Sequence, residues 1–135
     1  MVFRLICEIE EAEGKCPVSK WLDSNMTQRE RAKLHTRFNR IESDEAVNPN
    51  WLKPYTSLRM WEIRFDHGGK AFRFLCEVTD DNVIMVLATT KNGKITKQEE
   101  TRAVARRAAI KNGVAGVRIY PLPERASADL GPVRR

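Results

Sequence analysis

Three strand-like runs separated by two short turns, within residues 60–88, constrain the fold more than any other feature of this sequence. In the first two runs apolar and charged side chains alternate, so that each run presents one apolar and one charged face. The third run, 83–88, is apolar throughout, as expected for a strand in the middle of a sheet. Because the turns at 67–69 and 79–82 are short, the sequence predicts an antiparallel three-strand meander.

Two capping boxes indicate where helices begin. Thr27 with Glu30, and Thr96 with Glu99, each place a hydroxyl and a carboxylate three residues apart, where both satisfy backbone N–H groups at a helix start. The first helix is expected to end near residue 42 and to bury one stripe of apolar side chains: Leu34, Phe38 and Ile41. The second is expected to run to about residue 112 and has only a thin apolar stripe, made of alanines and Val104.

The remaining segments complete the order of elements. Residues 1–9 read as a strand, Pro17 suits the first turn of a short helix, and residues 48–54 have the composition of a loop. In the C-terminal segment, 114–135, three prolines predict a short strand over 117–120 and then an irregular tail.

The order strand, two helices, three-strand meander and helix predicts an α+β protein. We expect one domain over residues 1–113 and a C-terminal extension over 114–135. The longest apolar run is far shorter than the ~20 residues that cross a bilayer, and the first residues lack the apolar core of a signal peptide. Three cysteines without C-x-x-C spacing favour neither a disulfide framework nor a zinc site. We therefore expect a cytoplasmic protein without a membrane segment.

The positive charge is concentrated in the second part of the chain. Residues 1–50 carry eight basic and nine acidic side chains, whereas residues 51–135 carry sixteen and nine. Such a basic segment fits contact with a polyanion or with an acidic protein partner, and it is equally compatible with a solvated helix face.

Five segments in this order resemble a known protein family. They are 14–22 (GKCPVSKWL), 60–65 (MWEIRF), 71–74 (AFRF), the apolar strand 83–88, and 91–99 (KNGKITKQE). Together they resemble the RelE/ParE-type toxins of bacterial toxin–antitoxin pairs, and within them the phage-derived, HigB-like branch. The resemblance covers about 14–112 and implies a RelE-like fold.

The resemblance also implies a reaction and partners. The reaction is ribosome-dependent cleavage of messenger RNA by attack of a ribose 2′-hydroxyl on the adjacent phosphate, with no cofactor. The expected partners are messenger RNA, the ribosome and a cognate antitoxin that combines an acidic segment with a DNA-binding domain. No cluster of His, Cys, Asp and Glu in the sequence suggests a metal site.

The reaction requires a proton acceptor, cations for the developing charge and a proton donor, and basic residues of the matching segments are candidates. Arg64 and Arg73 are expected to clamp phosphate, because guanidinium groups fork onto its oxygens. Lys94 and Lys91 are expected to contact the substrate, and Lys94 is assigned to the catalytic set. Further residues assigned to substrate binding are His67, Arg59 and Lys70.

Several of these residues have a structural alternative. Arg64 could instead be an exposed charge on the solvent-facing side of a strand, and His67 could be a solvent-exposed histidine of a turn. Glu62 could either pair with a neighbouring cation or serve as a base. Among the aromatic residues, Trp61 is expected in the core, whereas Trp51 and Tyr55 are expected to stack on bases if their loop borders the cleft. His35 is interpreted as structural.

Two departures from the family pattern keep other functions open. Glu62 stands where the family's ribonucleases carry a cation, and residues 97–113 contain neither Tyr nor His. The alternatives are an inhibitor of a protein target such as DNA gyrase, as in the ParE branch, or an inactive phage-derived relative. For a toxin of this family, the charged rim of the helix 97–112 predicts an acidic partner segment that lies against this helix and against the basic loop 91–97. That rim comprises Arg102, Arg106, Arg107 and Lys111.

Overall fold

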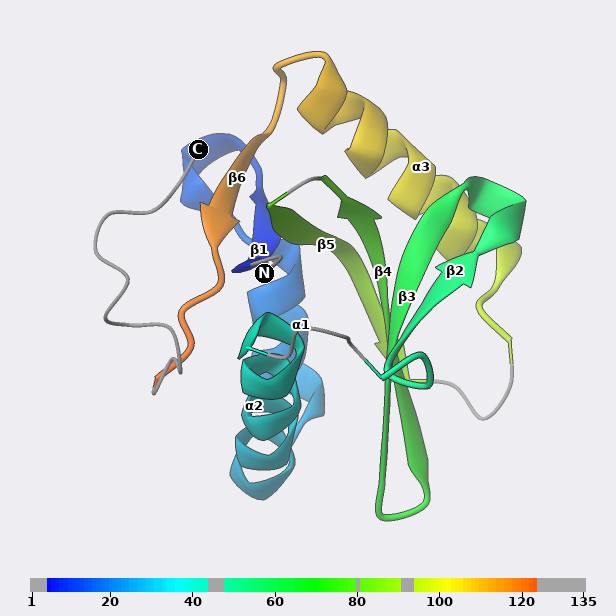
Figure 1. The fold of residues 1–135 in the computed structure, drawn as a ribbon. Helices are drawn as coiled ribbons and strands as arrows, with labels where there is room; N and C mark the ends of the chain where they lie inside the picture. The colour runs from blue at the N-terminus through cyan, green and yellow to red at the C-terminus, as the bar shows by residue number, and fades with distance from the viewer. Residues whose placement is uncertain (1–4, 44–47, 80, 91–93, 124–135) are drawn as a thin grey trace.

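The computed structural model of the protein describes residues 5–43, 48–79, 81–90 and 94–123. These residues form one six-stranded sheet with three α-helices, which confirms the α+β class (Figure 1). The helices are α1 (Pro17–Asn25), α2 (Gln28–Ser43) and α3 (Lys97–Lys111). The strands are β1 (Leu5–Glu10), β2 (Leu52–Tyr55), β3 (Met60–His67), β4 (Lys70–Val78), β5 (Asn82–Thr90) and β6 (Gly116–Ile119), with short 3₁₀ turns η1 (Ala12–Gly14) and η2 (Thr56–Leu58). No helix within these residues is long and apolar enough to cross a membrane.

The predicted meander is confirmed as strands β3, β4 and β5, which pair antiparallel. Between β3 and β4, Gly68 and Gly69 form a two-residue turn in which both have positive φ, 59° and 79°, a backbone that glycine adopts without strain. This turn sets the register of the hairpin, so that Arg64 lies directly opposite Arg73. The whole sheet has the order β2-β3-β4-β5-β1-β6, and β1 with β5 is its one parallel pair.

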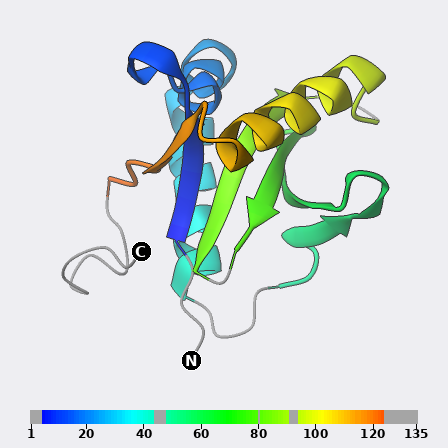
Figure 2. The ribbon, with the colours of Figure 1, turned by 90° about the horizontal axis from the view of Figure 1, so that it is seen from above.

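Helices cover both faces of the sheet (Figure 2). On one face α1 and α2 bury the main core, where Phe38 packs edge-on against Phe74 at 5.8 Å between ring centroids. On the other face α3 packs against a smaller cluster that includes Leu75 and Ala103. Arg64 of β3 and Arg73 of β4 share this second face with α3, beside the smaller cluster, because residues alternate along a strand.

Both predicted capping boxes are present. The Glu30 N–H donates to the Thr27 hydroxyl at 3.1 Å, and the Thr27 N–H donates to the Glu30 carboxylate at 2.8 Å. The same reciprocal pair joins Thr96 and Glu99 at the start of α3. Pro17 occupies the first turn of α1, as predicted.

Three local predictions are wrong. Residues 52–55 form the edge strand β2 instead of a loop, which tolerates Pro54 because an edge strand need not use every N–H. Trp61 is 38% exposed, because the core under α1 and α2 includes Ile63 but ends before Trp61. Val104 and Ala108 are exposed, since α3 turns Ala103 toward the sheet.

The C-terminal segment contains the predicted short strand. Strand β6 pairs antiparallel with β1, and Tyr120, which follows it, is fully buried. The fully buried Glu8 accepts hydrogen bonds from Arg118 of β6 and from Ser19 of α1, which ties the three elements together. The division of the chain at residue 113 stays a prediction, and the expected tail beyond 123 lies outside the described residues.

Candidate functional site

The three residues assigned to catalysis line one pocket on the face of the sheet that carries α3. Arg64 comes from β3, Arg73 from β4 and Lys94 from the segment before α3. The pocket has a volume of about 420 Å³. Its other lining residues come from the end of β2, from η2 and from the start of α3: Pro54, Tyr55, Thr56, Ser57, Glu62, Ile95 and Glu100.

Arg73 forms the floor of the pocket and is only 9% exposed. Its Nη1 donates to the Asp66 carboxylate at 2.7 Å and to the Phe72 carbonyl at 2.9 Å. A guanidinium has five N–H donors, so these two bonds orient the group and leave others for a ligand. These two bonds thereby hold the positive charge of Arg73 in place at the pocket.

Arg64 and Lys94 form the accessible part of the pocket. The Arg64 side chain is 37% exposed, and its Nε lies 3.8 Å from a Glu62 oxygen, which is an ion-pair distance but too long for a hydrogen bond. Glu62 therefore pairs with Arg64, the structural role weighed for it above. Lys94 is exposed, and no described carboxylate lies within ion-pair distance of it.

A hydrogen bond between Tyr55 and Glu100 closes one side of the pocket. The Tyr55 hydroxyl donates to the Glu100 carboxylate at 2.6 Å. Burial, together with this bond, raises the pKa of Tyr55 to about 12, so the phenol stays protonated at neutral pH. The neighbouring Glu99 accepts a bond from Thr89 of β5 at 2.5 Å, which attaches the first turn of α3 to the sheet.

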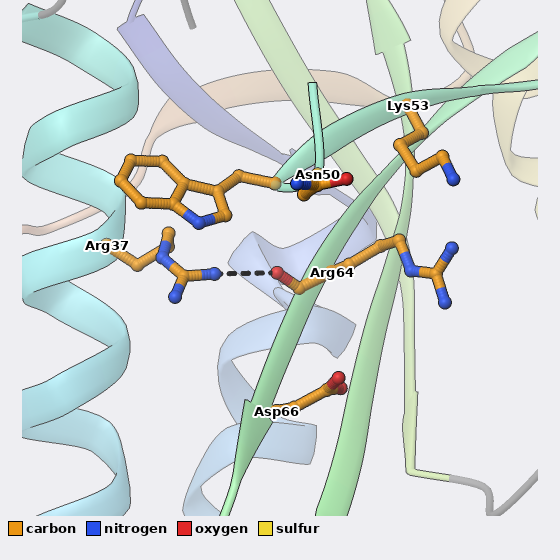
Figure 3. Close-up of a pocket in the computed structure, with 6 residues that line it drawn as sticks. Arg37, Asn50, Lys53, Arg64 and Asp66 are labelled. Atoms are coloured by element: carbon orange, nitrogen blue, oxygen red, sulfur yellow. Dashed lines mark hydrogen bonds between the residues drawn. The ribbon is translucent and has the colours of Figure 1, made fainter. Parts of the chain in front are cut away.

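A second pocket of about 370 Å³ adjoins the first across Arg64 (Figure 3). Its lining comprises Arg37, Asn50, Trp51, Lys53, Arg64 and Asp66. The Arg37 guanidinium lies 4.3 Å from the Trp51 ring centroid and 5.5 Å from that of Phe65, and it donates to the Arg64 carbonyl at 2.9 Å. The two aromatic rings hold this cation by cation–π contact.

Of the residues assigned to substrate binding, the three that the structure describes lie outside the lining of these two pockets. Arg59 lines a groove of about 670 Å³ beside α3, and His67 stacks on Phe65 at 6.0 Å between ring centroids. Lys70 forms an ion pair with Glu30 at 3.1 Å, and Lys91 lies outside the described residues. Within the described part of the chain, no three His, Cys, Asp or Glu side chains are grouped to hold a metal ion.

The expected basic rim of α3 is only partly free. Arg106 donates to the Val86 carbonyl at 2.8 Å and Arg107 to the Leu58 carbonyl at 2.6 Å, so the first side chain ties the helix to β5 and the second ties it to η2. These bonds take up part of the hydrogen-bonding capacity of both side chains, and the contact of this rim with an acidic partner stays a prediction. Arg102 and Lys111 are exposed.

Four residues at the two pockets carry roles that the sequence analysis did not assign. Glu100 and Arg37 belong to helices whose approach to the sheet no local pattern reveals, and Lys53 lies in the strand that was predicted as a loop. Tyr55 was named only as a base-stacking candidate, and the hydrogen bond to Glu100 is new. Both Trp51 and Tyr55 do border pockets; their stacking on bases stays a prediction.

Comparison with known proteins gives one family. A family model described as "Phage derived protein Gp49-like (DUF891)" matches residues 20–109. This span contains Arg64, Arg73 and Lys94, and also Arg37 and Lys53 of the adjoining pocket. No curated protein matches the chain.

Proposed function

The chain belongs to the Gp49-like family of phage-derived proteins, a family of toxin–antitoxin toxins, and we propose that it is a ribosome-dependent messenger-RNA endoribonuclease. The proposal includes a RelE-like arrangement of the fold, membership of the HigB-like branch and action in the cytoplasm. One observation carries it. Arg64, Arg73 and Lys94, drawn from three separate elements, line a single pocket of about 420 Å³.

The two arginines supply the charge that phosphate chemistry needs. When the ribose 2′-oxygen attacks the adjacent phosphorus, negative charge grows on the phosphate oxygens. In the proposed mechanism, Arg73, which is bonded to Asp66 at 2.7 Å, and the accessible Arg64 donate hydrogen bonds to those oxygens. Arginine suits this role because it stays charged at every relevant pH.

Proton transfer completes the reaction. The 2′-hydroxyl gives its proton to a pocket carboxylate, Glu62 or Glu100, as the new P–O bond forms. The bond to the leaving 5′-oxygen then breaks, and Lys94 donates the proton that this oxygen takes up. The products are a 2′,3′-cyclic phosphate and a 5′-hydroxyl. Tyr55, with its raised pKa, acts as a hydrogen-bond donor that orients Glu100.

Cleavage in a translating extract tests this proposal. Wild-type protein is expected to produce cut message, detected by primer extension, with cyclic phosphate at the new 3′ ends. Lys94→Met keeps the length of the side chain and removes its proton, and a lost general acid lowers cleavage about a hundredfold. Lys97→Met, an exposed lysine at the start of α3, is the matched control and is expected to cut like wild type. Intact message at every wild-type concentration would refute the endoribonuclease proposal.

A second function is favoured by the carboxylates of the pocket. Glu62 and Glu100 stand against three cations there, and Asp66 already pairs with Arg73, so the site is less positive than its arginines suggest. The second function that we propose is inhibition of a protein target such as DNA gyrase, without cleavage of RNA. Growth arrest with intact message and altered DNA supercoiling in the same cells would identify this function in place of RNA cleavage.

We propose that the antitoxin partner carries an acidic segment, beside a DNA-binding domain, that lies against the exposed face of α3. Because Arg102 and Lys111 are exposed there, reversing both to Glu is expected to slow association and to flatten its dependence on ionic strength. Arg29→Glu with Lys33→Glu on α2 changes the net charge equally and is the control. Stopped-flow association at low and high salt measures the effect, and equal rates for the two double variants would place the partner elsewhere.

A further inference from the structure

We propose that the pocket formed by Arg37, Lys53 and Arg64 binds a second phosphate of the RNA strand, next to the phosphate that is cleaved. The inference rests on the proposed function, because it takes RNA to be the ligand of the first pocket. It adds to Arg64 of the catalytic set two residues that the proposed reaction does not use, Arg37 and Lys53, with a nucleic-acid phosphodiester as the ligand.

The charges of this second pocket favour an anion. Arg37, Lys53 and Arg64 line it together with one carboxylate, Asp66. That carboxylate is held by Arg73 at 2.7 Å, so its charge is already compensated from the first pocket. Lys53 has no carboxylate within ion-pair distance among the described residues. Among the described residues, Arg37 and Lys53 are therefore left without a paired carboxylate at a polar cavity of about 370 Å³, and Arg64, whose Nε lies 3.8 Å from a Glu62 oxygen, is the third cation that lines it.

Arg37 is fixed before any ligand arrives. The last residue pair of β2 and β3 is Leu52 with Ile63, and one more backbone bond follows, from the Arg64 N–H to the Trp51 carbonyl at 2.8 Å, so β3 continues beyond Arg64 as an open edge. Arg37 reaches this edge from α2, donates to the Arg64 carbonyl at 2.9 Å and lies against Trp51 at 4.3 Å. Because the Arg37 guanidinium uses one N–H for the bond to the Arg64 carbonyl, its other N–H groups are available to a ligand. These groups are already oriented, so binding of an anion costs little additional side-chain entropy.

The two pockets are continuous through Arg64, which lines both. Figure 3 shows Lys53 and Arg64 extending to the same side, while Arg37 approaches the strand from α2. A single strand with one phosphate between Arg64 and Arg73 would place a neighbouring phosphate toward Lys53 and Arg37. A basic groove that follows the backbone is the usual form of sequence-independent single-strand binding. An acidic peptide has no comparable reason to share Arg64 with the cleavage site.

Binding of a non-cleavable RNA tests the site without requiring catalysis. The probe is a short, fully 2′-O-methylated oligonucleotide, measured by fluorescence anisotropy over a series of salt concentrations. Lys53→Met and Arg37→Met keep the apolar stems and remove the charge. Each is expected to weaken binding about three- to fivefold at low salt and to reduce the salt slope by about 0.7, the value for one phosphate of a single strand. Lys33→Met, exposed on α2, is the control and should match wild type.

A dinucleotide probe separates a local contact from a general electrostatic effect. It fills the first pocket only, so the Lys53→Met variant should bind it as tightly as wild type does. The inference would be overturned if Lys53→Met weakened the binding of both probes equally. It would also be overturned if this variant bound the longer probe with the affinity and salt slope of wild type. The inference would also be overturned if Lys53→Met and Arg37→Met lost binding to poly-glutamate but kept wild-type binding to RNA, because the pocket would then be a site for an acidic protein partner. If wild type binds RNA in this way but never cuts it, the proposed function fails and the phosphate site stands.

Discussion

Replacing Arg64 by methionine is expected to lower message cleavage about a hundred- to a thousandfold, the cost typical of losing one donor to a developing oxyanion. Arg64 lines both pockets and is the accessible guanidinium of the pair that faces the phosphate. Its ion pair with Glu62 is long, at 3.8 Å, and the side chain is 37% exposed, so the fold loses little. Single-turnover cleavage with saturating ribosomes isolates the chemical step.

Three comparisons make the Arg64 result decisive. Arg64→Lys keeps the charge without the forked geometry and is expected to recover only part of the rate. Arg29→Met, an exposed arginine at the start of α2, should cut like wild type. Thermal unfolding of all variants must agree with that of wild type. A folded Arg64→Met protein with the wild-type rate would remove Arg64 from the mechanism.

The parts of the fold that depend on neighbouring residues could be predicted from the sequence. Alternation of apolar and charged residues identified β3 and β4, and the capping boxes identified the starts of α2 and α3, because both signals come from residues a few positions apart. The Gly68–Gly69 turn also sets the register, which places Arg64 opposite Arg73.

Features that depend on distant contacts could not be predicted. The parallel pairing of β1 with β5 joins residues far apart in the chain, and no turn specifies it. Trp61 follows the alternation of an inward face, yet it is 38% exposed, because the helices that cover this face do not reach it. Periodicity indicates which side a residue faces and not how far the covering layer extends.

The same distinction explains what was found and missed at the site. Arg64 and Arg73 face each other through a local hairpin, so the pair follows from the sequence. Glu100 and Arg37 reach the pockets from helices, and α3 turns Arg106 toward a backbone carbonyl of β5 and Arg107 toward one of η2. From the sequence alone, a basic side chain on a helix is predicted to be exposed to solvent, and only the packing of the helix shows whether it bonds to another element.

Replacing Tyr120 by alanine is expected to cost about 3–5 kcal/mol of the free energy of unfolding, as for other large buried aromatic residues. Tyr120 is 1% exposed, and its ring meets Phe38 edge-on at 5.4 Å between centroids. It follows β6, so its loss detaches the C-terminal segment from the core beneath α2. Since small domains are stable by only about 5–15 kcal/mol, the variant should be largely unfolded at modest urea concentrations.

Graded substitutions identify the origin of this effect. Tyr120→Phe keeps the ring and loses the hydroxyl that lies 2.7 Å from His35 Nε2, so it should cost about 1 kcal/mol. Burial lowers the pKa of His35, which favours the neutral imidazole as the partner of this hydroxyl. Val114→Ala, at a side chain that is 78% exposed, should cost almost nothing. Urea unfolding followed by circular dichroism gives all three values. If Tyr120→Ala proved as stable as Val114→Ala, the segment after residue 113 would be an appendage, and the core would end with α3.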